Sequence, residues 1–212
     1  MPKIECTFKA TIVGCGSVGA TAAYGYLLSG AVTDLTIIDV DKAKAEGLHL
    51  DLEHALPFTP YMRIEATDDF SACEGSQIVV ITAGARQKEG QTRLDLVNTN
   101  RKIFDSIIPK LVKAAPKAIF IIVSNPVDVL TYHALKISGL PKNQLFGSGT
   151  ILDTARLRFH LSQKLRLHPS SIDAYVLGEH GDTSFPVYSS ANVLGKPLYK
   201  FNLEKNFYAH ES

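Results

Sequence analysis

The sequence predicts an α/β protein whose first part is a doubly wound parallel sheet, and two observations carry that prediction. Short apolar, β-branched runs recur along the chain, and amphipathic or Ala- and Leu-rich stretches separate them. Runs without polar alternation are typical of strands that are covered on both faces, as in a parallel sheet. Strand and helix in repeated alternation is the pattern of the doubly wound class. The predicted strands are residues 10–13, 35–38, 78–82, 118–123 and 145–147.

Helices are expected between these strands. Residues 17–29 are rich in Ala, Tyr and Leu, and residues 94–114 and 127–137 place apolar side chains at helical spacing. We place a domain boundary after residue 147, so that residues 1–147 form the first domain. Residues 148–212 then form the first part of a second, α+β catalytic domain, with a helix at about 152–164 and a strand at 172–177.

Length and charge narrow the class of protein. The 212 residues suffice for one domain and part of a second, at roughly 100 to 200 residues per domain. With 22 Lys+Arg against 21 Asp+Glu, the net charge of +1 favours neither nucleic acid nor an anionic membrane as a partner. Any anion site must therefore be local.

The three cysteines, Cys6, Cys15 and Cys73, show no CxxC spacing, so neither a disulfide framework nor a metal site is predicted. The beginning of the chain lacks the pattern of a secretory leader, and no apolar run reaches the roughly 18 residues of a membrane helix. We therefore expect a cytoplasmic protein in a reducing compartment.

A glycine motif follows the first predicted strand and opens the first predicted helix. Its glycines, Gly14, Gly16 and Gly19, have the spacing of the Rossmann dinucleotide fingerprint. In that motif the glycines allow a tight turn, close approach of the pyrophosphate and close packing of the helix. Main-chain N–H groups at the start of the helix then meet the phosphates.

Asp39 ends the second predicted strand, 20 residues past Gly19, where the fingerprint requires a carboxylate for the adenosine ribose. Val40 and Asp41 follow it and offer no cation for an added 2′-phosphate, which favours NAD over NADP. The alternative for Asp39 is a cap or a solvated turn at the end of the strand.

Four later segments carry polar groups in a specific order: residues 84–93, Ser124-Asn125-Pro126, residues 153–156 and residues 178–182. From about Phe8 to Leu198 the chain closely resembles the lactate and malate dehydrogenase family, and within it the L-lactate dehydrogenases. The resemblance implies a Rossmann-type domain, NAD as cofactor, and reversible hydride transfer between NADH and pyruvate, a reaction of glycolysis and fermentation.

Two charged residues and a histidine of the second domain suit this chemistry. Asp153 and Arg156 stand three apart on a predicted helix, so both can serve one site. The guanidinium of Arg156 suits a substrate carboxylate. His180 lies between glycines near a strand end and can exchange a proton near neutral pH. The resemblance makes His180 the general acid–base and Asp153 its orienting carboxylate; without it, Asp153 and Arg156 would be a surface ion pair.

The resemblance also assigns roles in the first domain. Arg93 matches an arginine that closes over the substrate on a loop and polarises its carbonyl. Asn125 matches an asparagine near the substrate oxygen and the nicotinamide, although an Asn-Pro turn is the plain alternative. Arg86 resembles a loop arginine near the cofactor phosphates. The full cofactor-binding set implied is Gly14, Gly16, Ser17, Val18, Gly19, Asp39, Thr82, Ala83, Gly84, Arg86, Val123 and Asn125.

Gln87 is the residue that bears most directly on the substrate. Lactate dehydrogenases resemble this sequence there, whereas malate dehydrogenases carry an arginine that pairs with the second carboxylate. A buried carboxylate without a partner costs several kcal/mol, so pyruvate is expected over oxaloacetate. Activity on oxaloacetate is the alternative, because Arg86 stands next to Gln87.

Two further expectations come from the resemblance. Family members are commonly tetramers or dimers, so a homo-oligomer, by resemblance a tetramer, is expected. Many bacterial relatives bind fructose 1,6-bisphosphate through an arginine and a histidine, and this chain has Arg158 but Asp173 at those positions. A carboxylate facing a sugar phosphate is repulsive, so little or no activation is expected.

Members of the family continue for about another hundred residues, which complete a second domain of ordinary size. The second domain of this chain is therefore expected to be incomplete and its active site open on one side. The alternative function is a catalytically inactive, truncated protein that holds NAD without turnover.

Overall fold

The computed structural model describes residues 7–85, 90 and 93–201, with the main chain alone at Arg93 and Leu94. The chain divides into two compact units, residues 1–147 and residues 148–212. Each unit is described by itself.

The first unit contains a six-stranded sheet in the order β3-β2-β1-β4-β5-β6, and every neighbouring pair is parallel. The order reverses between β1 and β4, which is where ligands bind in sheets of this class. The strands are β1 (Lys9–Val13), β2 (Asp34–Ile38), β3 (Arg63–Thr67), β4 (Ile78–Ile81), β5 (Ile119–Ile122) and β6 (Leu145–Gly147).

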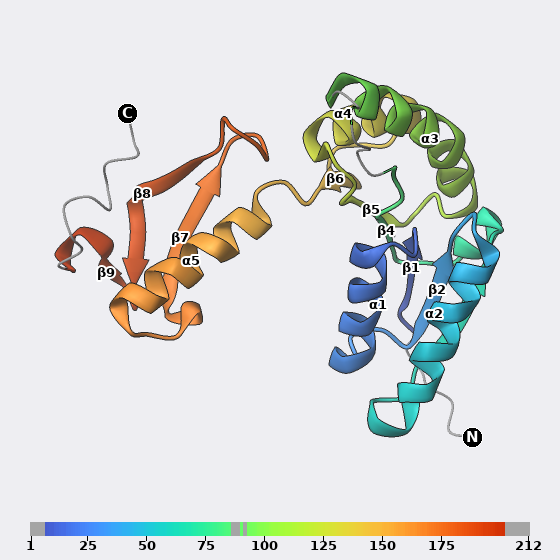
Figure 1. Ribbon diagram of the computed structural model, residues 1–212, viewed down its shortest axis with the longest axis horizontal. Helices are drawn as coiled ribbons and strands as arrows, with labels where there is room; N and C mark the ends of the chain where they lie inside the picture. The colour runs from blue at the N-terminus through green and yellow to red at the C-terminus, as the bar shows by residue number, and fades with distance from the viewer. Residues whose placement is uncertain (1–6, 86–89, 91–92, 202–212) are drawn as a thin grey trace. The chain divides into compact units, whose positions relative to one another are not determined.

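Four helices cover the two faces of this sheet (Figure 1). Helices α1 (Ser17–Ser29) and α2 (Lys42–Ala55) pack against one face, around Ile12 and Ile37. Helices α3 (Arg93–Ala114) and α4 (Val127–Ser138) pack against the other, around Val13 and Phe120. Successive residues of a strand thus point to opposite faces of the sheet and pack into two separate cores. Short 3₁₀ turns, η1 (Leu56–Phe58) and η2 (Phe70–Cys73), join the remaining segments.

The fold class predicted from the sequence is confirmed, and three details differ. The edge strand β3 was not predicted, because its sequence RIEAT alternates charged and apolar residues instead of forming an apolar run. Thr82 lies just beyond β4, which ends at Ile81. Strand β5 is not buried throughout, since Ile119 is 40% exposed.

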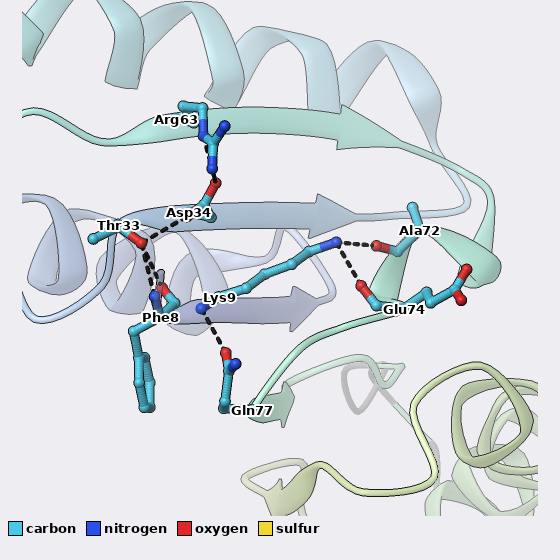
Figure 2. Close-up of polar contacts among 8 residues, drawn as sticks. All are labelled: Phe8, Lys9, Thr33, Asp34, Arg63, Ala72, Glu74 and Gln77. Atoms are coloured by element: carbon cyan, nitrogen blue, oxygen red, sulfur yellow. Dashed lines mark hydrogen bonds and ion pairs between the residues drawn. The ribbon is translucent and has the colours of Figure 1, made fainter. Parts of the chain in front are cut away.

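Polar contacts hold the sheet together at the amino ends of β1 and β2 (Figure 2). The Lys9 ammonium group donates to the main-chain oxygens of Ala72 at 2.7 Å and of Glu74 at 2.9 Å. The guanidinium of Arg63 on β3 pairs with the carboxylate of Asp34 on β2. Burial raises the pKa of Asp34, but hydrogen bonds from Arg63 and Thr33 outweigh it and hold that pKa below its usual range.

The second unit is a helix packed on an antiparallel sheet. Its elements are α5 (Ile151–Leu165), η3 (Pro169–Ser171), β7 (Ile172–Leu177), β8 (Phe185–Val193), β9 (Lys196–Pro197) and η4 (Leu198–Lys200). The strands follow the order β7-β8-β9. Strand β7 alternates strictly, so that Ile172, Ala174 and Val176 are buried while its other face is exposed. Their core is small, with Leu161 of α5 at its centre. Within the described part of the chain, no helix is long and apolar enough to cross a membrane.

Candidate functional site

A cavity of about 800 Å³ opens in the first unit where the strand order reverses. Its walls are the carboxyl ends of β1, β2 and β4 together with one side of α3, and its size is within the usual range for small-molecule sites. The lining residues are Val13, Gly14, Cys15, Gly16, Ser17, Ala20, Ile38, Asp39, Val40, Lys44, Phe70, Thr82, Ala83, Gly84, Ala85, Ile103, Ser106 and Ile107.

The three glycines of the loop after β1 differ in what surrounds them. Gly14 has a φ of +103°, and a Cβ there would lie 2.6 Å from the main-chain nitrogen of Ala83. A Cβ at Gly19 would lie 1.9 Å from the oxygen of Gly14, so α1 packs directly on the loop. A Cβ at Gly16 would meet nothing within 4 Å. The space over Gly16, at the start of α1, is therefore open to a phosphate.

Asp39 both anchors this loop and faces the cavity. Its Oδ2 accepts a hydrogen bond from the Cys15 main-chain nitrogen at 2.6 Å, and its Oδ1 accepts one from the Asp41 nitrogen at 3.0 Å. The hydrogen bond from Asp41 forms a turn at the end of β2, which is the alternative role considered for Asp39 from the sequence. Because a carboxylate has about four acceptor sites, Asp39 retains capacity for the two hydroxyls of a ribose.

Lys44 is a lining residue that the sequence analysis missed. Helix α2 starts at Lys42, directly after its cap Asp41, so its first turn folds back beside the end of β2. This brings Lys44 into the lining of the cavity together with Asp39, and the charges of both act on Cys15. The sequence analysis considered only Val40 and Asp41, the two residues that follow Asp39 and offer no cation, whereas Lys44 reaches the cavity from the first turn of α2. Phe70 and three residues of α3, Ile103, Ser106 and Ile107, were missed for the same reason.

Cys15 contributes a neutral thiol to the cavity. It is 5% exposed, and burial together with the nearby Asp39 carboxylate raises the pKa of its thiol from 9.0 to about 12. A thiolate is the reactive form of cysteine, so this side chain is chemically inert at neutral pH.

Side-chain hydroxyls tie the loops of the cavity to one another. Thr82 Oγ1 donates to the oxygen of Gly14 at 2.8 Å, which joins the loops after β4 and β1. Ser124 Oγ donates to the oxygen of Ala83 at 2.7 Å, which joins the loops after β5 and β4. The Asn125–Pro126 peptide is cis.

Not every predicted cofactor residue lines the cavity. Gly14, Gly16, Ser17, Asp39, Thr82, Ala83 and Gly84 do so. Val18, which is 56% exposed, and Gly19, Val123 and Asn125 do not. Arg86 and Gln87 lie outside the described residues, and so does the side chain of Arg93, although its main chain begins α3.

In the second unit, α5 and β7 bring the three predicted catalytic groups together. Asp153 Oδ2 lies 2.6 Å from Nδ1 of His180. Asp153 Oδ1 lies 3.4 Å from Nη1 of Arg156, one turn further along α5. Asp153 and His180 are about one quarter exposed or less, whereas the Arg156 side chain is 60% exposed. The carboxylate thus holds one edge of the imidazole, while the guanidinium faces outward.

Two threonines that the sequence analysis missed position this group. Thr150 Oγ1 donates to the oxygen of Val176 at 2.7 Å, and Thr154 Oγ1 accepts from the Val176 nitrogen at 3.0 Å. They fasten the first turn of α5 to the end of β7. Gly178 follows with a φ of +97°, and a Cβ there would lie 2.9 Å from the oxygen of Thr183. This sharp turn directs the chain toward His180.

The two residues compared with the fructose 1,6-bisphosphate site of bacterial relatives, Arg158 and Asp173, lie on α5 and β7. Arg158 Nε donates to the oxygen of Ala174 at 3.0 Å, and its guanidinium lies 4.9 Å from the ring centroid of Tyr175. Asp173 is exposed on β7. Within the described ranges, no group of three or more His, Cys, Asp or Glu side chains could hold a metal ion.

Family models match both units of the chain. Residues 8–147 match the NAD-binding domain of lactate/malate dehydrogenase, and residues 150–211 match the alpha/beta C-terminal domain of the same family. The matched ranges agree with the division of the chain into two units.

Curated relatives are L-lactate dehydrogenases. That of Synechococcus sp. (strain JA-3-3Ab) is 48% identical over 196 residues, which are 92% of this chain and 64% of the relative. The L-lactate dehydrogenase B-A chain of Danio rerio is 50% identical over 194 residues, which are 92% of this chain and 58% of the relative. The chain thus spans just under two thirds of the length of these relatives.

Solved structures agree. A lactate dehydrogenase from a Medee basin deep-sea metagenome library matches with a TM-score of 0.88 and 44% identity, over 92% of this chain and 62% of its own. The minor L-lactate dehydrogenase of Enterococcus mundtii matches with a TM-score of 0.89 and 40% identity, over 94% and 63% respectively. The chain belongs to the lactate/malate dehydrogenase family, and its first unit is that family's NAD-binding domain.

Proposed function

We propose that this protein is an NAD-dependent L-lactate dehydrogenase that interconverts pyruvate and L-lactate. The observation that carries the proposal is the contact of 2.6 Å between Asp153 and Nδ1 of His180, with Arg156 one turn away. A histidine oriented by a carboxylate, beside a guanidinium, is the set of groups that reduction of a 2-keto acid requires.

The first step belongs to the cofactor cavity. NADH, when bound, supplies the hydride. Asp39 would accept hydrogen bonds from the adenosine ribose, and the main chain at Gly16 would meet the pyrophosphate. Lys44, which lines the same cavity, would add a positive charge for the phosphates of the cofactor.

The second step belongs to the second unit. Arg156 would pair with the substrate carboxylate through its planar fork, which fixes the face of the keto carbon. His180 would then give a proton from Nε2 to the substrate oxygen as the carbonyl carbon receives its hydride. Asp153 would accept a hydrogen bond from Nδ1–H of His180 and so stabilise the imidazolium before it gives up the Nε2 proton. The sum is pyruvate, NADH and one proton giving L-lactate and NAD⁺.

Three assignments of the first unit rest on the family resemblance. Arg93 would polarise the substrate carbonyl, and Asn125 would lie near the substrate oxygen. Gln87, which is neutral, supports pyruvate over oxaloacetate, because the second carboxylate of oxaloacetate would lack a partner. A homotetramer, a cytoplasmic location and weak or absent activation by fructose 1,6-bisphosphate remain predictions from the same resemblance.

The test is NADH oxidation by the 212-residue chain with pyruvate and, separately, with oxaloacetate. A clear preference for pyruvate is expected. A preference for oxaloacetate would support malate dehydrogenase activity instead. Binding of NADH without oxidation by either acid would support the alternative of an NAD-binding protein without turnover.

The Asp153→Asn variant tests the catalytic group. It is expected to lower kcat by about 10² to 10⁴, because the amide no longer fixes the tautomer of His180 or stabilises its charge. NADH affinity should stay unchanged. Asp173→Asn is the matched control, since it removes an exposed carboxylate of β7 in the same unit. Equal activity of the two variants would contradict the role of Asp153.

A further inference from the structure

Asn100 lies on α3 and is 1% exposed. Its side-chain amide is used entirely by main-chain groups of two loops. Oδ1 accepts a hydrogen bond from the Ala85 nitrogen at 2.7 Å, and Nδ2 donates to the oxygen of Asn125 at 2.8 Å. Nδ2 also lies 3.5 Å from the oxygen of Ala85, a weaker contact. One amide therefore bridges the loop after β4 and the loop after β5.

These two loops belong to one half of the dinucleotide site. In a doubly wound sheet each half binds one mononucleotide, and the halves meet where the strand order reverses. Asp39, at the end of β2, assigns the adenosine to the half that contains β1, β2 and β3. Ala85 and Asn125 follow strands of the other half, which leaves them to the nicotinamide half.

The packing around the amide is close. A Cβ at Gly84 would lie 3.4 Å from both Nδ2 and Oδ1 of Asn100. The first part of the loop that follows β4 therefore packs against the amide. Gly84 and Ala85 line the cavity, whereas Asn100 does not. A shift of the Asn100 side chain would therefore move a wall of the cavity and the Asn125 main chain together.

Asparagine suits this position because it offers a donor and an acceptor on one planar group. An apolar residue would remove the partner of the Ala85 nitrogen and of the Asn125 oxygen, both in partly buried hydrogen bonds. An aspartate would keep the acceptor but would set a second oxygen against the Asn125 oxygen.

We propose that Asn100 is a positioning residue that holds the main chains of Ala85 and Asn125 where the nicotinamide half of the cofactor requires them. This inference rests on the proposed function, since it presumes that the cavity receives NADH. Asn100 acts through the two loops and does not itself touch the cofactor.

The experiment compares binding of NADH and of ADP, which carries only the adenosine half, to the 212-residue chain and its variants. Asn100→Asp is expected to weaken NADH binding by about tenfold or more, because it turns one hydrogen bond into a repulsive contact. ADP affinity should stay within about twofold, because the loop after β1 and Asp39 are untouched.

Ser76→Ala is the matched control. Ser76 is 6% exposed, and its hydroxyl lies 2.7 Å from that of Thr11, just before the amino end of β4 and away from the cavity. This variant also removes a buried hydrogen bond of the first unit, but both affinities should stay within about twofold of the wild type. If Asn100→Asp does not yield folded protein, Asn100→Ser is expected to show the same difference between NADH and ADP.

The outcomes separate the two proposals. Unchanged NADH binding in the Asn100 variants, or an equal loss of NADH and ADP binding, would overturn the role of Asn100 alone. Wild-type protein that binds neither nucleotide would overturn the cofactor function of the cavity, and the Asn100 proposal with it.

Discussion

Two glycines of α1 have the same chemistry but opposite surroundings. A Cβ at Gly19 would lie 1.9 Å from the oxygen of Gly14, whereas a Cβ at Gly25 would meet nothing within 4 Å. Both lie within the helix, so neither needs the left-handed backbone that favours glycine. The close approach of α1 to its loop is therefore the reason for glycine at position 19, while position 25 has no such reason.

Gly19→Ala is expected to lower the free energy of unfolding by about 1 to 3 kcal/mol, because α1 must move away from the loop. NADH binding should weaken as well, since the same loop would hold the phosphates. Urea unfolding and an NADH fluorescence titration measure the two effects.

Gly25→Ala, the control in the same helix, should raise stability by about 0.5 to 1 kcal/mol, because alanine favours the helix. Similar changes in the stability of the two variants would show that the close approach of α1 to the oxygen of Gly14 does not require glycine at position 19.

Cys15 makes stability depend on alkaline pH. Because burial and Asp39 raise its pKa from 9.0 to about 12, the folded state favours the neutral thiol. Its contribution to stability is complete below pH 9 and is lost as the pH rises from 9.0 toward about 12.

Cys15→Ala is therefore expected to lose less stability than the wild type as the pH rises above 9.0. Cys73, whose pKa burial raises to about 11, titrates in both proteins, so the difference isolates Cys15. The measurement is urea unfolding at a series of pH values. Parallel curves for the two proteins would contradict the expected neutral thiol.

At the scale of elements, Lys9 joins β1 to the segment that follows β3. Its ammonium group reaches two main-chain oxygens at the end of η2, those of Ala72 and Glu74, as Figure 2 shows. These oxygens have no strand partner in the sheet, so the lysine supplies the hydrogen bonds that secondary structure does not. Lys9 thus shares with Thr11, whose hydroxyl contacts that of Ser76, the task of holding the segment that leads into β4 against β1.

Lys9→Met keeps the aliphatic stem and removes the donor. We expect a loss of about 1 to 2 kcal/mol in the free energy of unfolding, because two hydrogen bonds from a charged group to main-chain oxygens, one of them partly buried, are lost. Faster amide exchange at residues 72–76 should accompany it. The exposed Lys117, replaced by Met in the same way, should change stability by less than about 0.5 kcal/mol. An equal effect of both substitutions would contradict the bridging role of Lys9.

At the scale of the whole molecule, the first unit holds its own core and its own cavity. Every buried residue of the two cores that enclose the sheet lies before residue 148. The described lining of the cavity runs from Val13 to Ile107. The second unit has a separate and much smaller core, with six fully buried apolar residues.

Residues 1–147 expressed alone are therefore expected to fold and to bind NADH within about threefold of the affinity of the whole chain. A cooperative unfolding transition and an NADH titration of the fragment check this. Loss of binding in a folded fragment would show that the second unit contributes to the cofactor site.

The sequence predicted those parts of the fold that local pattern specifies. The apolar runs of β1, β2 and β4 are buried on both faces, so their position in the core is visible without neighbours. Strand β3 lies at the edge of the sheet and needs one half-buried face only. Its five residues alternate charged with apolar, which is a weaker signal over so short a stretch than the continuous apolar runs of the central strands.

The residues of the candidate site also fall into those that local sequence indicated and those that only the structure showed. Gly14, Gly19 and Asp39 were identified from spacing alone, because the turn, the helix start and the strand end are consecutive in the chain. Helical spacing indicated only that Asp153 and Arg156 share one helix face, and their predicted roles, like that of His180, came from the resemblance. Lys44, Phe70 and Asn100 carried no local signal, since each reaches the site from an element that the fold returns to the sheet edge.

The sequence by itself thus determined the doubly wound class and the dinucleotide loop, and it predicted the catalytic groups. Only the tertiary structure decided which other side chains line the cavity and which groups contact one another. It set the Asp153 carboxylate 2.6 Å from His180, brought Lys44 into the cavity that Asp39 lines, and bridged Ala85 to Asn125 through Asn100. The physical reason is range: backbone preferences and hydrophobic periodicity act over a few residues, whereas hydrogen bonds between loops depend on packing across the whole sheet.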